Sequence, residues 1–145
     1  MTLPSQHGSA QRRGPVELSP MLLLWIGVGG AIGSVVRALL TSQLNAAFPY
    51  GTLSVNIIGS LAIGVLLATS ATAVISEAVR LPLIVGTLGG FTTMSAFSFE
   101  SVELLRGGSP LHGIAYITLT LLLCLGAVAL GLVLAERLFP QVAPH

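Results

Sequence analysis

The stretch from residue 89 to residue 93 is the best suited to chemistry, because paired glycines are followed directly by paired threonines inside an apolar segment. Gly89 and Gly90 precede Phe91, and Thr92 and Thr93 follow it. Glycine disfavours a helix by about 1 kcal/mol per residue, and threonine hydroxyls compete for backbone hydrogen bonds. A helix broken here would free carbonyl oxygens, which are hard ligands suited to a small cation. A helix that is only kinked is the alternative.

Further polar and apolar side chains follow on the same segment. Met94 and Phe97 are three residues apart and share one helix face, while Ser95 and Ser98 share an adjoining face. An apolar stripe with this spacing usually serves packing. Glu100 lies near the end of the segment, where a solvated interfacial charge is the default interpretation.

Other apolar segments also contain isolated polar residues. Asn56 must find a hydrogen-bond partner or line water, so it predicts either contact between helices or a donor in a pore. Tyr116, Thr120 and Cys124 are spaced by four residues and place small dipoles along one helix face. Arg37 either extends to the lipid headgroups, holds a helix end or attracts anions into a vestibule.

The residue types argue against an enzyme and against binding of nucleic acid. No nucleophile lies beside a base, and no pairing of His, Glu or Asp suggests acid–base catalysis or a metal site of that kind. The single cysteine, Cys124, rules out an internal disulfide. The formal net charge is only +1, and the sequence has neither Lys nor Asp, so no basic patch is present.

Composition and hydropathy indicate what must position these residues. The chain is 53% hydrophobic and 8% charged, with a mean hydropathy of +0.92. Crossing a bilayer core takes roughly 20 apolar helical residues. Stretches at about 20–40, 53–74, 81–105 and 111–134 meet this requirement. We therefore predict an all-α integral membrane protein with four transmembrane helices in residues 20–137, a flexible N-terminal tail at 1–19 and a C-terminal tail at 138–145.

The arginines give only a weak signal for orientation in the membrane. Four of them fall on the amino-terminal side, namely Arg12, Arg13, Arg80 and Arg137. Arg37 and Arg106 fall on the other side, so the bias is small. Such a chain is expected to insert both ways, or one way with a sister chain opposite.

The combined motifs resemble those of the CrcB (Fluc) fluoride channel family, over residues 25–134 and in the same order. They are Gly29-Gly30 with Gly33 and Arg37, Gly51-Thr52-Leu53 with Val55-Asn56 and Gly59, and Gly89-Gly90-Phe91-Thr92-Thr93 with Ser95, Phe97, Ser98 and Glu100. The third motif is the most specific. The resemblance implies an antiparallel, dual-topology dimer with its third helix broken at the membrane midplane, two narrow fluoride pores and one central structural sodium ion.

The resemblance also assigns residues to these sites. The carbonyls of Gly89 and Thr92 match those that hold sodium. The expected pore residues are Asn56, Met94, Ser95, Phe97, Ser98, Tyr116 and Thr120. Arg37 and Glu100 are expected to have vestibule or structural roles. Met94 replaces the first phenylalanine of the family motif, and Cys124 stands where a hydroxyl is more usual.

The function expected from this resemblance is passive export of fluoride across the cell membrane, which lowers its cytoplasmic concentration. A small proton-coupled exporter of cations is the main alternative, but it needs a carboxylate in its first helix, and residues 21–40 contain none. A scaffold subunit would explain the glycine-rich packing but not the Gly-Gly and Thr-Thr stretch. A homodimer and an obligate heterodimer with a paralogue both remain open.

Overall fold

The computed structural model describes residues 18–70 and 75–139. The predicted N-terminal tail lies outside these residues except at its end, and so does most of the predicted C-terminal tail. Every named element is a helix. They are α1 Pro20–Leu44, α2 Tyr50–Ser70, α3 Glu77–Leu81, the π-helix η1 Pro82–Leu88, α4 Gly89–Phe91, α5 Met94–Arg106 and α6 Pro110–Leu138.

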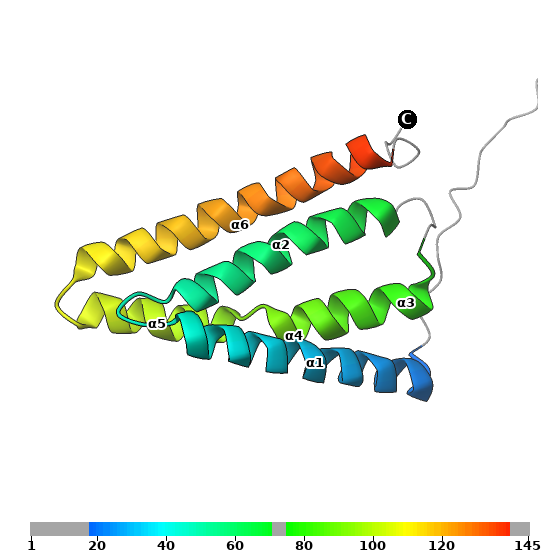
Figure 1. Cartoon of the computed structure of the whole chain (residues 1–145), viewed down its shortest axis with the longest axis horizontal. Helices are drawn as coiled ribbons and strands as arrows, with labels where there is room; N and C mark the ends of the chain where they lie inside the picture. Colours follow the sequence, from blue (N-terminus) through cyan, green and yellow to red (C-terminus); the bar gives the residue numbers. More distant parts are fainter. Residues whose placement is uncertain (1–17, 71–74, 140–145) are drawn as a thin grey trace, which may run out of the picture.

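These elements form four spans that are long and apolar enough to cross a membrane. The spans are Pro20–Leu44, Tyr50–Thr69, Ala78–Arg106 and Pro110–Leu138. Consecutive spans run in opposite directions, so α1 begins and α6 ends at the same end of the bundle (Figure 1). At the opposite end, α1 leads into α2 and α5 leads into α6. The prediction of an all-helical chain with four membrane-spanning helices is confirmed.

The connection between α1 and α2 is shorter than the sequence predicted. The α1 helix continues to Leu44, and the backbone N–H of Asn45 still donates to the Thr41 carbonyl (2.9 Å). Asn45 follows, and its Oδ1 accepts the backbone N–H groups of Gly51 (2.8 Å) and Thr52 (3.2 Å). Because this side chain satisfies N–H groups that have no intrahelical partner, α2 begins at Tyr50 rather than at residue 53.

The third span changes its backbone path at the two threonines. After α4, Thr92 (ψ 156°) and Thr93 (ψ 112°) adopt extended conformations. Helix α5 then starts at Met94, where the Thr93 hydroxyl accepts the backbone N–H of Ala96 (3.2 Å). Figure 1 shows the ribbon leaving its helical path between α4 and α5, well inside the length of the bundle.

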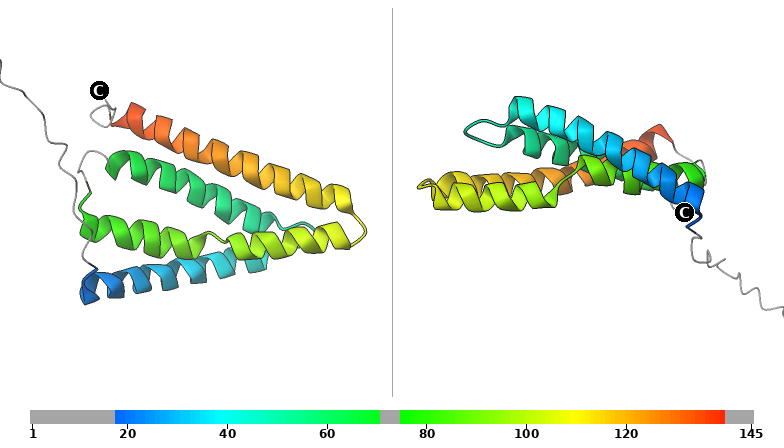
Figure 2. Two further views of the ribbon diagram at one scale, coloured as in Figure 1. Left: turned by 180° about the vertical axis from the view of Figure 1, so that it is seen from behind. Right: turned by 90° about the horizontal axis from the view of Figure 1, so that it is seen from below.

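Glycines allow close approach between helices. The α1 helix packs along η1 and α4, and α2 packs along α6 (Figures 1 and 2). A Cβ added at Gly29 would lie 2.7 Å from the Pro82 carbonyl oxygen, and one at Gly33 would collide with the Thr87 carbonyl. Both glycines are buried. Small residues at these two positions therefore let α1 pack closely against the third span.

The buried core is small, and much of the apolar surface faces outward. Leu53, Phe97 and Tyr116 form one buried cluster near the end where α5 joins α6. Large hydrophobic side chains are exposed along α1, α5 and α6, including Trp25, which is 54% exposed. This distribution suits a helical bundle whose solvent is lipid.

Candidate functional site

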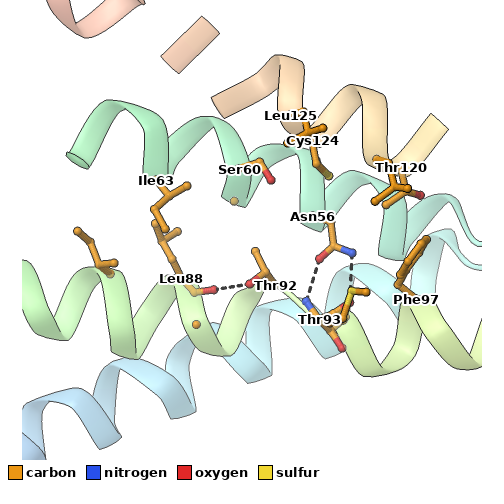
Figure 3. A pocket seen from close by; sticks show the side chains of 15 residues that line it. Asn56, Ser60, Ile63, Leu88, Thr92, Thr93, Phe97, Thr120, Cys124 and Leu125 are labelled. Atoms are coloured by element: carbon orange, nitrogen blue, oxygen red, sulfur yellow. Dashed lines mark hydrogen bonds between the residues drawn. The ribbon is translucent and has the colours of Figure 1, made fainter. Parts of the chain in front are cut away.

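The extended threonines lie beside a pocket of about 370 Å³, which we call the central pocket. Its walls come from α2, η1, α4, α5 and α6 (Figure 3). Six of the residues expected to hold sodium or line the pore are in its walls, namely Asn56, Gly89, Thr92, Met94, Phe97 and Thr120. Ser60, Thr93 and Cys124 line it as well. The fold therefore brings residues from three of the four spans to one place.

Asn56 joins α2 directly to the interruption of the third span. Its Nδ2 donates to the Thr93 carbonyl (3.2 Å), and its Oδ1 accepts the Thr93 backbone N–H (2.8 Å), as Figure 3 shows. The side chain is buried, with 9% of its surface exposed. The amide thus pairs both backbone groups of a residue that has left the helix, where an unpaired buried group would be costly.

The same hydrogen bonds leave two carbonyls without their helical partners. In a continuous helix, the Gly89 carbonyl would accept the N–H of Thr93, and the Thr92 carbonyl would accept that of Ala96. The first N–H donates instead to Asn56, and the second donates to the Thr93 hydroxyl. The Thr92 side chain is directed elsewhere, because its hydroxyl donates to the Leu88 carbonyl (3.0 Å). Gly89 and Thr92 can therefore offer their backbone carbonyl oxygens to a ligand.

Side chains of α1 reach the Gly90 carbonyl, which lies between those of Gly89 and Thr92 in the sequence. Arg37 Nε donates to the Gly90 carbonyl oxygen (3.1 Å), and the Ser34 hydroxyl lies 3.4 Å from the same oxygen. Of the three roles considered for Arg37, the structure shows that of holding a helix end. The guanidinium also places a positive charge beside the interruption.

A second polar group of residues joins α2, α5, α6 and the α1–α2 connection near the α5–α6 end of the bundle. Glu100 Oε1 accepts from the Thr52 hydroxyl (2.7 Å) and from Asn45 Nδ2 (3.0 Å). Glu100 Oε2 accepts from the Tyr116 hydroxyl (2.7 Å). The Tyr116 ring packs against Phe97, with centroids 5.4 Å apart. The carboxylate therefore has three neutral donors, which compensate for its partial burial.

Comparison with known protein families identifies the chain. The model of the family described as CrcB-like protein, Camphor Resistance (CrcB), matches residues 24–132. The chain belongs to the CrcB family.

Several members of the CrcB family are similar along almost their whole length. A protein of Sorangium cellulosum is 44% identical over 119 residues, which cover 79% of this chain and 94% of the relative. One from Sulfurovum sp. is 40% identical over 126 residues, which cover 84% of this chain and 99% of the relative. One from Thermus thermophilus is 43% identical over 116 residues, covering 77% and 87%. Each of these relatives is named fluoride-specific ion channel FluC.

In this CrcB chain, the remaining predicted pore residues lie away from the central pocket. Tyr116 is fully buried, and its hydroxyl faces Glu100. Ser98 donates to the Met94 carbonyl (2.8 Å), and the Ser95 hydroxyl lies 3.2 Å from that of Thr93. Ser95 and Ser98 are exposed and do not line the central pocket.

The CrcB motif residues that line the central pocket differ in exposure. Met94 is 70% exposed, whereas Phe97 is 6% exposed. The Thr120 hydroxyl is buried without a hydrogen-bond partner among the described residues. The pocket thus combines an open side at Met94 with an unsatisfied donor on α6.

Sequence reasoning missed Asn45 and Thr52 as members of the Glu100 group. Asn45 falls between the first two apolar stretches and is not among the predicted site residues, although asparagine commonly bonds nearby backbone N–H groups. The signal was its position a few residues before the Gly51-Thr52 motif. Its contact with Glu100 joins residues 55 positions apart, which no local pattern reveals.

Proposed function

We propose that this chain is a subunit of a passive, fluoride-selective channel that lets fluoride leave the cytoplasm. Membership of a family whose relatives are named fluoride-specific ion channels supports the substrate. The single observation that carries the mechanism is the interruption at Thr92 and Thr93 beside the central pocket.

The two helix ends at this interruption favour ions of opposite charge. The N-terminus of α5 carries partial positive charge, since its first N–H groups lack intrahelical acceptors. The C-terminus of α4 carries partial negative charge on its free carbonyls. Interrupted membrane helices use this pair of ends to bind anions and cations inside a bilayer. One end thus serves a permeating anion, and the other serves a structural cation.

Fluoride must exchange its water for donors in the pore, because an unpartnered ion in a low-dielectric environment is very costly. Asn56 uses one Nδ2 hydrogen for Thr93 and has a second hydrogen available. Thr120 offers a hydroxyl with no other partner among the described residues. Phe97 can present the positive edge of its ring. Met94 supplies only a polarizable thioether, so it is a poorer anion contact.

The carbonyls of Gly89 and Thr92 fit a small hard cation, and we assign them to the sodium site that the family resemblance implies. Both oxygens lack their helical N–H donors, which meets the chemical requirement for such a ligand. One chain supplies two oxygens, so a shared ion requires a second copy related by two-fold symmetry. When bound, sodium would neutralise the converging carbonyl dipoles and hold the two interruptions together.

An antiparallel dimer of this chain, or of this chain with a paralogue, also accounts for the open side of the central pocket. Lipid cannot satisfy the Thr120 hydroxyl or the carbonyls of Gly89 and Thr92 that have lost their helical donors. The highly exposed Met94 stands at the same place. We propose that the partner subunit covers this side and that the pore runs along the covered pocket.

The proton-coupled exporter is less consistent with the site. Helix α1 contains no carboxylate. Glu100 is held by three donors from three other segments, which suits a fixed structural charge better than one that exchanges protons for a substrate. We therefore retain the channel as the proposed function.

Efflux from liposomes loaded with potassium fluoride tests this proposal. Purified protein reconstituted alone should dissipate a fluoride gradient passively while leaving a chloride gradient intact. Chloride flux comparable to fluoride flux would contradict it. Inactivity of the chain alone, with activity restored by a co-reconstituted paralogue, would instead support the heterodimeric form.

A further inference from the structure

A second pocket, of about 450 Å³, lies where α1 meets α2 and α5 meets α6, and we call it the end pocket. Asn45 and Pro49 line it from the α1–α2 connection, Glu100 and Glu103 from α5, and His112 from the start of α6. All four spans end close to this level. The end pocket therefore lies where the bundle meets water.

The end pocket is connected to the central pocket through packed residues. Glu100 lines the end pocket and accepts the Tyr116 hydroxyl (2.7 Å). The Tyr116 ring packs on Phe97, which lines the central pocket. Tyr116 and Phe97 therefore form the packed contact between the two pockets, and we place the route of a permeating ion along it. In the proposed channel, the end pocket is thus a vestibule, and the present inference rests on that proposed function.

The charge of this vestibule is unfavourable for an anion. Glu100 and Glu103 face it from α5, His112 faces it from α6, and the α1–α2 connection adds no charged residue. No ion pair within 4.0 Å joins either carboxylate to another residue in the described part of the chain, and Arg106 does not line the pocket. His112 is exposed, with its Nδ1 2.5 Å from the Ser109 hydroxyl.

We infer that protonation of His112 increases fluoride conduction by offsetting the negative charge of the end pocket. Histidine is the side chain that ordinarily changes charge between about pH 5 and 8. A positive charge about 8 Å from an anion in a hydrated pocket raises the local anion concentration about two- to fivefold. Salt should weaken it, since the pocket is open to water.

The test measures fluoride efflux through the full-length protein in liposomes at about pH 5.5 and about pH 8, with equal pH on both sides. Hydrogen fluoride crosses lipid unaided at low pH, so protein-free liposomes supply the background to subtract. We expect flux to be about two- to fivefold higher at the lower pH. His112→Gln should remove this difference and leave flux near the wild-type value at the higher pH.

Two sets of variants make the result specific. The inference assigns the pH response to His112, so the matched variants of the other two histidines, His7→Gln and His145→Gln, should retain the full response. Glu103→Gln removes a negative charge and should raise flux at the higher pH. Wild-type flux that does not change with pH, or a pH response that survives in His112→Gln, would overturn the inference while leaving the channel itself established. Absence of fluoride flux at both pH values would instead overturn the proposed function.

Discussion

The side-chain amide of Asn56 and the backbone of Thr93 exchange two hydrogen bonds, of 2.8 and 3.2 Å, across 37 residues of sequence. This pairing explains how a membrane helix can stop and restart. It occupies the N–H that the Gly89 carbonyl would otherwise accept, so the same asparagine that stabilises the interruption also frees a potential cation ligand. Asn56 therefore acts on the backbone as well as on the proposed pore.

The first prediction concerns Asn56→Leu. This variant keeps a side chain of similar size but replaces the amide with an apolar group, so both hydrogen bonds to Thr93 are lost. Two buried backbone groups of Thr93 would lose their partners, at about 1–3 kcal/mol each. We expect a lower thermal unfolding temperature in detergent and a loss of fluoride flux per reconstituted protein. Ser60→Ala removes a hydroxyl from the same pocket and should retain most of both properties. Full flux in Asn56→Leu would show that neither the donor nor the backbone pairing is needed.

The second prediction compares two glycines of α1. A Cβ at Gly33 would collide with the Thr87 carbonyl and lie 2.8 Å from the backbone nitrogen of Phe91, whereas one at Gly27 would meet nothing within 4 Å. Gly33→Ala should therefore separate α1 from η1 and α4 and lower the yield of folded protein. Gly27→Ala should be neutral or slightly stabilising, because alanine favours a helix by about 1 kcal/mol over glycine. Equal unfolding temperatures for the two variants would contradict this packing.

The third prediction concerns the group of residues around Glu100. Tyr116→Phe removes one donor to the carboxylate, and hydrogen bonds to charged groups contribute about 1.5–3 kcal/mol. We expect a clear drop in thermal stability. Tyr50→Phe is the matched control, because the Tyr50 ring is 59% exposed. A drop of the same size in both variants would show that the Tyr116 hydroxyl has no special role.

The helices themselves were predictable, because apolar stretches of sufficient length leave few alternatives in a chain with 8% charged residues. The residues at which the helices begin and end were less predictable. The second helix begins at Tyr50 because Asn45 folds back onto Gly51 and Thr52, and this depends on tertiary geometry. The π-helical stretch at Pro82–Leu88 left no signal that hydropathy could detect.

The position of the site was predictable from residue types, but the contacts of its residues were not. Gly89, Gly90, Thr92 and Thr93 are unusual in an apolar segment, so their types alone drew attention to the place where the backbone becomes extended. The partners are distant in sequence. That Arg37 donates to Gly90, and that Tyr116 donates to Glu100 instead of lining the central pocket, follows from how the four spans pack. Spacing within one helix cannot show such contacts.

The last prediction tests the assignment of sodium to the backbone of the interruption. Since carbonyl oxygens are the proposed ligands, Thr92→Ser should keep flux within about twofold of wild type, because it preserves the hydroxyl that bonds Leu88. Gly89→Leu should impair assembly and flux, because a large side chain would have to fit beside the proposed shared ion. In a single subunit a Cβ at Gly89 lies 3.8 Å from the Ile84 carbonyl oxygen, so Gly89→Ala should leave the helices of each chain intact.

Removal of sodium during purification should lower dimer content and fluoride flux, and adding it back should restore both. No sodium should cross the membrane with fluoride, because the ion would be held at the centre of the dimer. Radioactive sodium uptake measured together with fluoride efflux separates this case from a sodium-coupled transporter. Full activity after exhaustive sodium removal would refute the site, and fluoride accumulation driven by a sodium gradient would refute a passive channel.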